Sequence, residues 1–111
     1  MGLYDNTFYS VAAANAMCHG DRIAWFDDES GVSISFARYF ETAERLAAGL
    51  RNAGIRKGDR IAILGKNRFE YFLVFGAAAA LGAVVVPINW RLSAEEIAFN
   101  INDTGCSVLF L

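Results

Sequence analysis

The fold of this chain is decided by residues 60–88, which read RIAILGKNRFEYFLVFGAAAALGAVVVPI. Residues 61–64 are apolar on both faces, a pattern typical of a parallel strand that is covered on both sides. Asn67 can cap the helix that follows, with Glu70 three residues later completing a capping box, and helix-forming residues continue up to the next glycine. Val84-Val85-Val86 then favours a second strand. Strand, helix and strand in this order predict two parallel strands joined by a crossover helix.

The same stretch raises a membrane alternative, because Tyr71–Ile88 is an 18-residue run without a charged side chain. Such a run reaches the length at which a membrane-spanning helix becomes feasible. Four consecutive alanines add little hydrophobicity to it, Gly82 interrupts it, and Pro87 would break a helix near its end. We therefore expect a buried helix that ends at Gly82 and no transmembrane segment, with a small membrane-associated protein built around this run as the alternative.

Before this stretch, the clearest helix covers Phe36–Ala53, where apolar residues recur at helical spacing on one face. Ser35 can cap its start, and Gly54 can adopt the left-handed conformation past its end. Glu41 and Arg45 are placed to form an i,i+4 ion pair on its surface. Three shorter elements are expected before it, namely a helix over Thr7–Met17 and two strands, Arg22–Phe26 and Val32–Ser35, that form a β-hairpin around the turn-forming residues 27–31.

After the stretch, Ser93 and Glu96 have the spacing of a full capping box at the start of another helix. That helix ends near Asn102–Gly105, and an apolar strand, Ser107–Leu111, follows it. The expected fold class is therefore α/β, with a partial parallel sheet, covering helices and an N-terminal β-hairpin.

Composition limits the kind of protein this can be. The chain has 111 residues, of which 55% are hydrophobic, and this excludes intrinsic disorder. Its formal net charge of −2 provides no basic surface for nucleic acid or an anionic membrane. A mean hydropathy of +0.30 exceeds what so small a domain can easily bury, and a final buried strand would leave backbone groups without partners. We therefore expect residues 1–111 to be a truncated piece of a larger domain, whose remainder, or a second copy of the chain, would cover the apolar surface.

Few residues offer catalytic or metal-binding chemistry. Cys18 and His19 form a single Cys/His pair, which is too small for a metal site, and Cys106 lies far along the chain. We therefore expect two buried or half-buried thiols and a surface histidine. Residues 1–10 show no features of a secretory signal, so the cytoplasm is the expected compartment. Gly65-Lys66 superficially resembles a phosphate loop but lacks both the first glycine of that motif and the Ser or Thr after the lysine.

Two polar triplets remain as candidate ligand-contacting residues, Lys66-Asn67-Arg68 and Asn89-Trp90-Arg91. Each follows a predicted parallel strand, so both should lie at the carboxyl edge of the sheet, where ligands bind in α/β folds. One interpretation is a rim that contacts an anion. The other interpretation, which we favour because Asn67 already serves as a helix cap, is a structural role in which these side chains tie neighbouring loops together.

A series of segments in a fixed order carries a family resemblance: Ser35-Phe36, residues 45–50, residues 58–64 with Asn67 and Glu70, residues 82–92, Glu95-Glu96-Ile97 and residues 102–105. Together they resemble the N-terminal region of the adenylate-forming enzymes, the superfamily of acyl-CoA synthetases, luciferases and peptide-synthetase adenylation domains. The Pro-x-Asn-x-Arg-Leu pattern of residues 87–92 looks most like the fatty acyl-CoA synthetase branch. The resemblance covers nearly the whole chain and implies a piece of the family's large N-terminal domain, which precedes a small mobile C-terminal domain.

The resemblance implies a function for a parent enzyme rather than for this chain alone. Family members use ATP and Mg²⁺ to convert a carboxylic acid to an acyl-adenylate, and coenzyme A then displaces AMP as the thioester forms. The family's phosphate loop, its adenine and ribose motifs and its C-terminal lysine are absent from residues 1–111, so no catalytic, cofactor-binding or metal-binding residue carries over. We expect a scaffold that is inactive alone and binds none of these cofactors. The alternative is a free-standing α/β protein-interaction module without catalysis.

Overall fold

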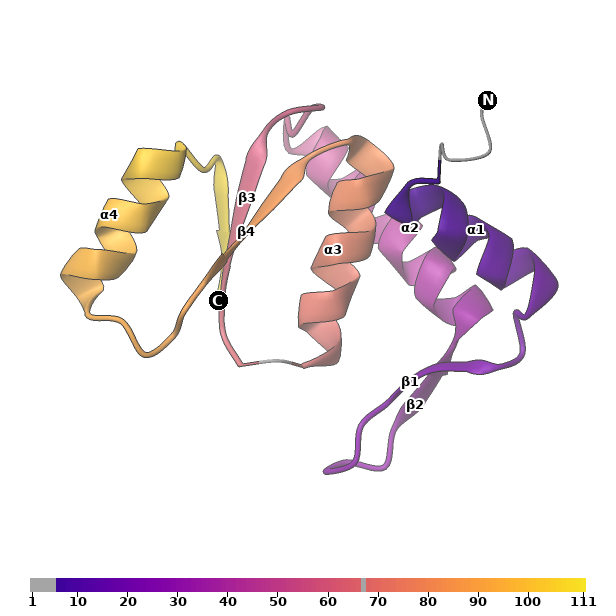
Figure 1. Cartoon of the computed structure of the whole chain (residues 1–111). Coiled ribbons are helices and arrows are strands. Elements are labelled where there is room, and N and C mark those ends of the chain that lie inside the picture. The colour runs from indigo at the N-terminus through magenta and orange to yellow at the C-terminus, as the bar shows by residue number, and fades with distance from the viewer. Residues whose placement is uncertain (1–5, 67) are drawn as a thin grey trace.

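The computed structural model describes residues 6–66 and 68–111. In this part of the chain the elements follow in the predicted order: a helix, a hairpin, a second helix, and then strand, helix, strand, helix and strand (Figure 1). Their bounds are α1 (Phe8–Cys18), β1 (Ile23–Phe26), β2 (Ser33–Ser35), α2 (Phe36–Asn52), β3 (Arg60–Leu64), α3 (Phe69–Leu81), β4 (Val84–Ile88), α4 (Ala94–Thr104) and β5 (Val108–Phe110). The predicted α/β class with an N-terminal hairpin is therefore confirmed.

The main sheet has three parallel strands with β3 in the centre, in the order β4-β3-β5. Ile61 of β3 is in register with Val85 on one side and Val108 on the other. Strand β4 continues two residues further than the predicted valine run and includes Pro87. Proline is tolerated there because β4 is an edge strand of the described sheet, where a missing amide hydrogen costs no ladder hydrogen bond.

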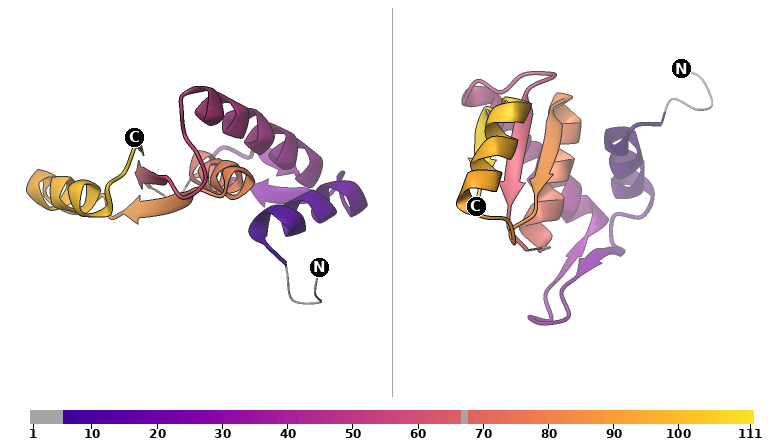
Figure 2. Two further views of the ribbon diagram at one scale, coloured as in Figure 1. Left: turned by 90° about the horizontal axis from the view of Figure 1, so that it is seen from above. Right: turned by 60° about the vertical axis from the view of Figure 1, so that its left-hand side comes forward.

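The two crossover helices lie on opposite faces of this sheet. Helix α3 leads from β3 to β4, and α4 leads from β4 back past β3 to β5. Because parallel crossovers keep one hand, a reversal in the direction of strand addition places the second helix on the other face. Figure 2 shows the resulting layers, with α4 on one side of the sheet and α3, flanked by α2 and α1, on the other.

The hydrophobic core lies between β3 and the helix pair α2–α3. Ile61 is fully buried there, and Ile63 points to the same face because side chains alternate along a strand. Ala62 and Ile88 are buried on the opposite face, the side on which α4 lies (Figure 2). The core cluster consists of Ala47, Leu50, Ile55, Ile61, Ile63, Val74, Ala77 and Ala78.

The predicted signals at the ends of α2 are confirmed. Ser35 Oγ accepts a hydrogen bond from the Arg38 amide at 3.1 Å. Gly54 follows the helix with a φ of +102°, and the Ile55 amide donates to the Leu50 carbonyl oxygen at 3.0 Å, which is the bond of a Schellman motif. The predicted ion pair also forms, with Arg45 Nη2 lying 2.7 Å from Glu41 Oε1.

The caps of the two crossover helices differ from the sequence prediction. Helix α3 begins with Arg68 as its N-cap residue, which makes no side-chain cap hydrogen bond, and the predicted cap Asn67 lies outside the described residues. At α4, Ser93 Oγ accepts from the Glu96 amide at 3.3 Å. No return bond from the Glu96 side chain is found among the described residues, so only half of the predicted box is observed.

Helix α3 has 13 residues, and no helix in the described ranges has both the length and the apolar character needed to cross a membrane.

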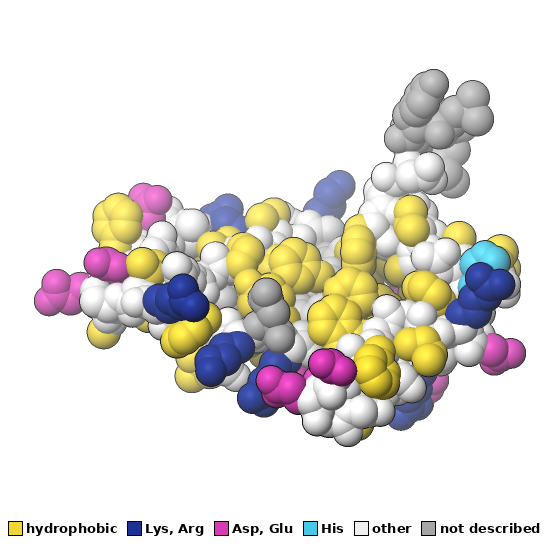
Figure 3. Space-filling view, turned by 60° about the horizontal axis from the view of Figure 1, so that its bottom comes forward, with side chains coloured by type: hydrophobic (Ala, Val, Ile, Leu, Met, Phe, Trp, Pro, Cys, Tyr) yellow, Lys and Arg dark blue, Asp and Glu magenta, His cyan; other side chains and the backbone are white. Residues whose placement is uncertain are grey.

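A large share of the apolar side chains stays at the surface. Figure 3 shows hydrophobic side chains gathered across the middle of one face. The large exposed ones belong mainly to α1, the hairpin, the edge strands and α4: Phe8, Tyr9, Val11, Met17, Ile23, Phe26, Val32, Val84, Trp90, Phe99, Leu109 and Leu111.

Candidate functional site at the carboxyl edge of the sheet

The loops after β3 and β4 start side by side, because Leu64 and Ile88, the last residues of the two strands, are paired in the ladder. Lys66 follows β3, and Trp90 and Arg91 follow β4. The structure brings these three side chains together. Lys66 Nζ lies 5.1 Å from the centroid of the Trp90 ring, and Arg91 Cζ lies 5.2 Å from it.

The Trp90 ring is therefore in cation–π contact with two basic groups, since both lie within about 6 Å of its centroid. The side chain remains 47% exposed, so the ring and its two cations form a partly open basic surface. The part of the chain that the structure describes shows no acidic side chain in a salt bridge with Lys66 or Arg91.

Asn89 has a local structural role in the same loop. Its Oδ1 accepts a hydrogen bond from the Arg91 amide at 3.0 Å, and its carbonyl oxygen accepts from the Leu92 amide at 3.2 Å. These two bonds form a tight turn that presents Trp90 and Arg91 at the end of β4. Asn89 thus shapes the loop and uses its side-chain oxygen within it.

The place of this cluster in the fold is significant for ligand binding. Neighbouring strands β3 and β4 send their connections to opposite faces of the sheet, α3 to one and α4 to the other (Figures 1 and 2). In open α/β sheets, such a reversal leaves a crevice outside the carboxyl ends of the two strands, and ligands bind there. Lys66, Trp90 and Arg91 lie at this position.

Arg68, the last residue of the first candidate triplet, lines a second feature, which it shares with Lys66. It contributes to a groove of about 840 Å³ between the hairpin and the beginning of α3. The groove has an acidic lip at the hairpin turn and basic side chains opposite it. A hydrogen bond from Ser30 and, to a smaller extent, the charge of Arg68 lower the pKa of Asp27 on that lip. The sequence analysis missed this groove, because its two walls are distant in the sequence and carry no shared pattern.

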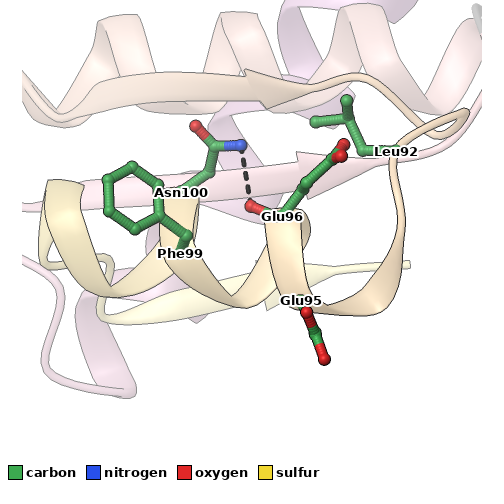
Figure 4. A pocket seen from close by; sticks show the side chains of 5 residues that line it. All are labelled: Leu92, Glu95, Glu96, Phe99 and Asn100. Atoms are coloured by element: carbon green, nitrogen blue, oxygen red, sulfur yellow. Dashed lines mark hydrogen bonds between the residues drawn. The ribbon is translucent and has the colours of Figure 1, made fainter.

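A shallower hollow of about 350 Å³ lies on the outer side of α4, and Figure 4 shows the side chains around it. Its lining consists of Leu92, Glu95, Glu96, Phe99 and Asn100. Asn100 Nδ2 donates to the Glu96 carbonyl oxygen at 2.9 Å, so the amide is used within the helix. Phe99 is 66% exposed beside it. The hollow combines apolar surface with two carboxylates, and it contains no nucleophile.

The cysteines and the histidine are dispersed. The expected burial is wrong for Cys18, a free thiol that is exposed because it lies at the C-terminal end of α1, and His19 is the exposed C-cap residue of that helix. Cys106 is also free and half-buried, with its Sγ 3.0 Å from Thr104 Oγ1. In residues 6–66 and 68–111, no three His, Cys, Asp or Glu side chains come together in a way that could hold a metal ion.

Comparison with known proteins places this arrangement in a family. The family model described as AMP-binding enzyme matches residues 12–111. The long-chain-fatty-acid–CoA ligase FadD13 of Mycobacterium tuberculosis is 42% identical over 86 residues, which make up 78% of this chain and 17% of that protein. Feruloyl-CoA synthase of an Amycolatopsis species is 43% identical over 79 residues, or 71% of this chain and 16% of that protein.

A solved structure gives the same result. It is a protein from Rhodopseudomonas palustris assigned as a long-chain-fatty-acid CoA ligase, and it matches with a TM-score of 0.90 and 42% identity over 97% of this chain and 27% of that chain. This chain thus spans about a sixth of the length of the two curated relatives. Sequence and fold agree over nearly all of its residues, and the chain belongs to the AMP-binding enzyme family.

Proposed function

We propose that residues 1–111 form part of an ATP-dependent, AMP-forming acyl-CoA ligase in the cytoplasm. The whole enzyme would convert a carboxylic acid and ATP to an acyl-adenylate and pyrophosphate, and coenzyme A would then take the acyl group as AMP leaves. The observation that carries this proposal is the fold match to the Rhodopseudomonas palustris protein over 97% of this chain at 42% identity.

The acid is proposed to be a fatty acid. Two relatives support this choice, since FadD13 and the Rhodopseudomonas palustris protein are both described as long-chain-fatty-acid CoA ligases. The relative described as feruloyl-CoA synthase shows that similar N-terminal regions also occur in proteins named for an aromatic acid. A test of the proposal therefore has to include both classes of acid.

Within this enzyme, residues 1–111 are proposed to be scaffold that is catalytically inactive alone and binds no cofactor. Three strands of a parallel sheet and their covering helices would support the part of the enzyme that holds the substrates. Lys66 and Arg91 face the Trp90 ring, which favours the interpretation that they tie loops together over direct contact with a bound anion. The Mg²⁺ ion is proposed to be held by other parts of the enzyme and by substrate phosphates.

Acid-dependent exchange of labelled pyrophosphate into ATP tests the activity. The full-length protein that contains this chain should show exchange with a long-chain fatty acid, less with ferulate, and none without an acid. Residues 1–111 alone should show none under any condition. Absence of exchange in the full-length protein with every acid class would remove the ligase assignment and favour a protein-interaction module. Exchange by residues 1–111 alone would contradict the scaffold role.

A further inference from the structure

We propose that Trp90 is a positioning residue that couples the two loops at the carboxyl edge of the sheet, and this inference rests in part on the proposed function. Trp90 lies in the loop between β4 and α4, whereas Lys66 lies in the loop between β3 and α3. The 5.1 Å contact from Lys66 Nζ to the Trp90 ring crosses from one loop to the other. Among the described residues, no hydrogen bond or salt bridge links these two loops.

The described residues show how the two ends of this contact are held. The Asn89 turn and the Ser93 cap give the β4–α4 loop internal hydrogen bonds, at 3.0 Å to the Arg91 amide and 3.3 Å to the Glu96 amide. The β3–α3 loop ends at Arg68, an N-cap residue that makes no side-chain cap bond. The β4–α4 loop therefore holds the Trp90 ring in place by its own hydrogen bonds, and Lys66 of the neighbouring loop rests on that ring.

Arg91 strengthens this assignment. Its guanidinium lies 5.2 Å from the same ring, so Trp90 contacts two positively charged groups at the carboxyl edge of the sheet. An aromatic ring suits this task because it attracts cations and leaves their charge in place, whereas a carboxylate would neutralise it. The positions of the two charges are thus restricted, and their long-range field can steer the phosphates of an approaching cosubstrate without a direct contact in the bound state.

Hydrogen–deuterium exchange of the full-length protein that contains this chain tests the coupling directly. Trp90→Ala should raise the exchange rate of amides in residues 65–70 by about two- to fivefold, because a cation–π contact at an exposed site is worth about 0.5–1 kcal/mol. Trp90→Phe keeps a ring and should change these rates much less. Lys66→Gln should reproduce the effect of Trp90→Ala, and the double variant should add little to either one. Phe99→Ala removes another exposed aromatic side chain and serves as the control, with no effect on residues 65–70.

Kinetics of the full-length ligase test the positioning role. Trp90→Ala should raise the KM for ATP or for coenzyme A by about two- to fivefold, in line with the same contact strength, and leave kcat nearly unchanged. Trp90→Phe should restore the KM. Unchanged hydrogen–deuterium exchange of residues 65–70 in both Trp90→Ala and Lys66→Gln would overturn the coupling. An unchanged KM for both cosubstrates in Trp90→Ala would overturn the positioning role. If the wild-type enzyme showed no carboxylic-acid-dependent ligase activity, the proposed function and the positioning role would both be removed. The hydrogen–deuterium exchange experiment would still decide whether Trp90 couples the two loops.

Discussion

The hydroxyl of Tyr39 donates a hydrogen bond to the carbonyl oxygen of Phe72 at 2.9 Å, while the two rings stack with their centroids 4.4 Å apart. Tyr39 is only 3% exposed, and its contacts join α2 to α3. Phe72 also contacts Trp25 of the hairpin at 5.3 Å and Phe8 of α1 at 6.1 Å between ring centroids. A single residue of α3 thus joins the N-terminal elements to the body of the fold.

Tyr39→Phe should lower the free energy of unfolding by about 1 kcal/mol, because it removes a buried hydrogen bond and keeps the ring stacking. Urea denaturation followed by circular dichroism measures the change. Tyr71→Phe is the matched control, since Tyr71 is half-buried on α3 and no hydrogen bond of its hydroxyl is found among the described residues. Equal effects of the two substitutions would mean that the Tyr39 hydrogen bond contributes nothing specific.

Tyr39 should also make stability depend on pH in the alkaline range. Burial raises the pKa of Tyr39 from 10.0 to about 12. The folded state therefore keeps the phenol proton at pH values where the unfolded state loses it, so this contribution is complete below pH 10 and is lost as the pH rises through 12. Denaturation curves at increasing pH should fall more steeply for the wild type than for Tyr39→Phe. Parallel pH profiles would contradict the assignment.

Gly76→Ala should destabilise the protein by about 1–3 kcal/mol, because an added methyl group overpacks the contact between α2 and α3. A Cβ atom at residue 76 would lie 2.5 Å from Tyr39 Oη and 2.9 Å from Ala43 Cβ. Gly49→Ala is the matched control, since residue 49 is also helical. Apart from its chain neighbours and the backbone of its own helix, no atom lies within 4 Å of a Cβ added there. It should stabilise the helix by about 0.5–1 kcal/mol, and thermal or urea unfolding should show shifts of opposite sign. Shifts of the same sign would contradict this packing.

Ser35→Ala should cost about 1 kcal/mol, because it removes the cap bond to the Arg38 amide. Ser35→Asp should retain the stability, since a carboxylate accepts the same bond and the first turn of α2 carries no other acidic residue. Urea denaturation at low salt compares the two variants. A loss of stability in both would show that this serine is needed for something other than capping.

The isolated chain should self-associate, because exposed Phe8, Val32 and Phe99 leave apolar surface on three separate elements. Sedimentation velocity over a range of concentrations measures this. The average mass should rise with concentration, and the effect should weaken when an exposed apolar residue such as Phe99 is replaced by a charged one. A monodisperse monomer at all concentrations would contradict this prediction.

Local signals in the sequence predicted most of the element order and several of the helix ends. Ser35, Gly54 and the Glu41–Arg45 pair act as predicted, because capping and i,i+4 contacts involve only neighbouring residues. The capping box of α1 was missed, although the Thr7 and Ser10 side chains both take part in it. Ser10 occupies the position where Glu or Gln is usual, so the pattern was not recognised.

The candidate site was predictable only in outline. The strand–loop–helix pattern placed Lys66 and Trp90 at one edge of a parallel sheet, and the ladder between β3 and β4 confirms that placement. The pattern could not show that Lys66 and Arg68 both line the hairpin groove, nor that Lys66 also contacts Trp90. The direction of a loop side chain depends on neighbours that periodicity does not describe.

By itself, the sequence determined the alternation of strands and helices, because the spacing of apolar residues differs between strands and helices and shows which faces of an element are buried. Only the tertiary structure decided that β3 lies between β4 and β5, that Phe72 joins α1 and the hairpin to α3, and that Trp90 gathers two cations. These features depend on contacts between residues far apart in the chain. Such contacts form only when the elements pack, and no local pattern specifies their geometry.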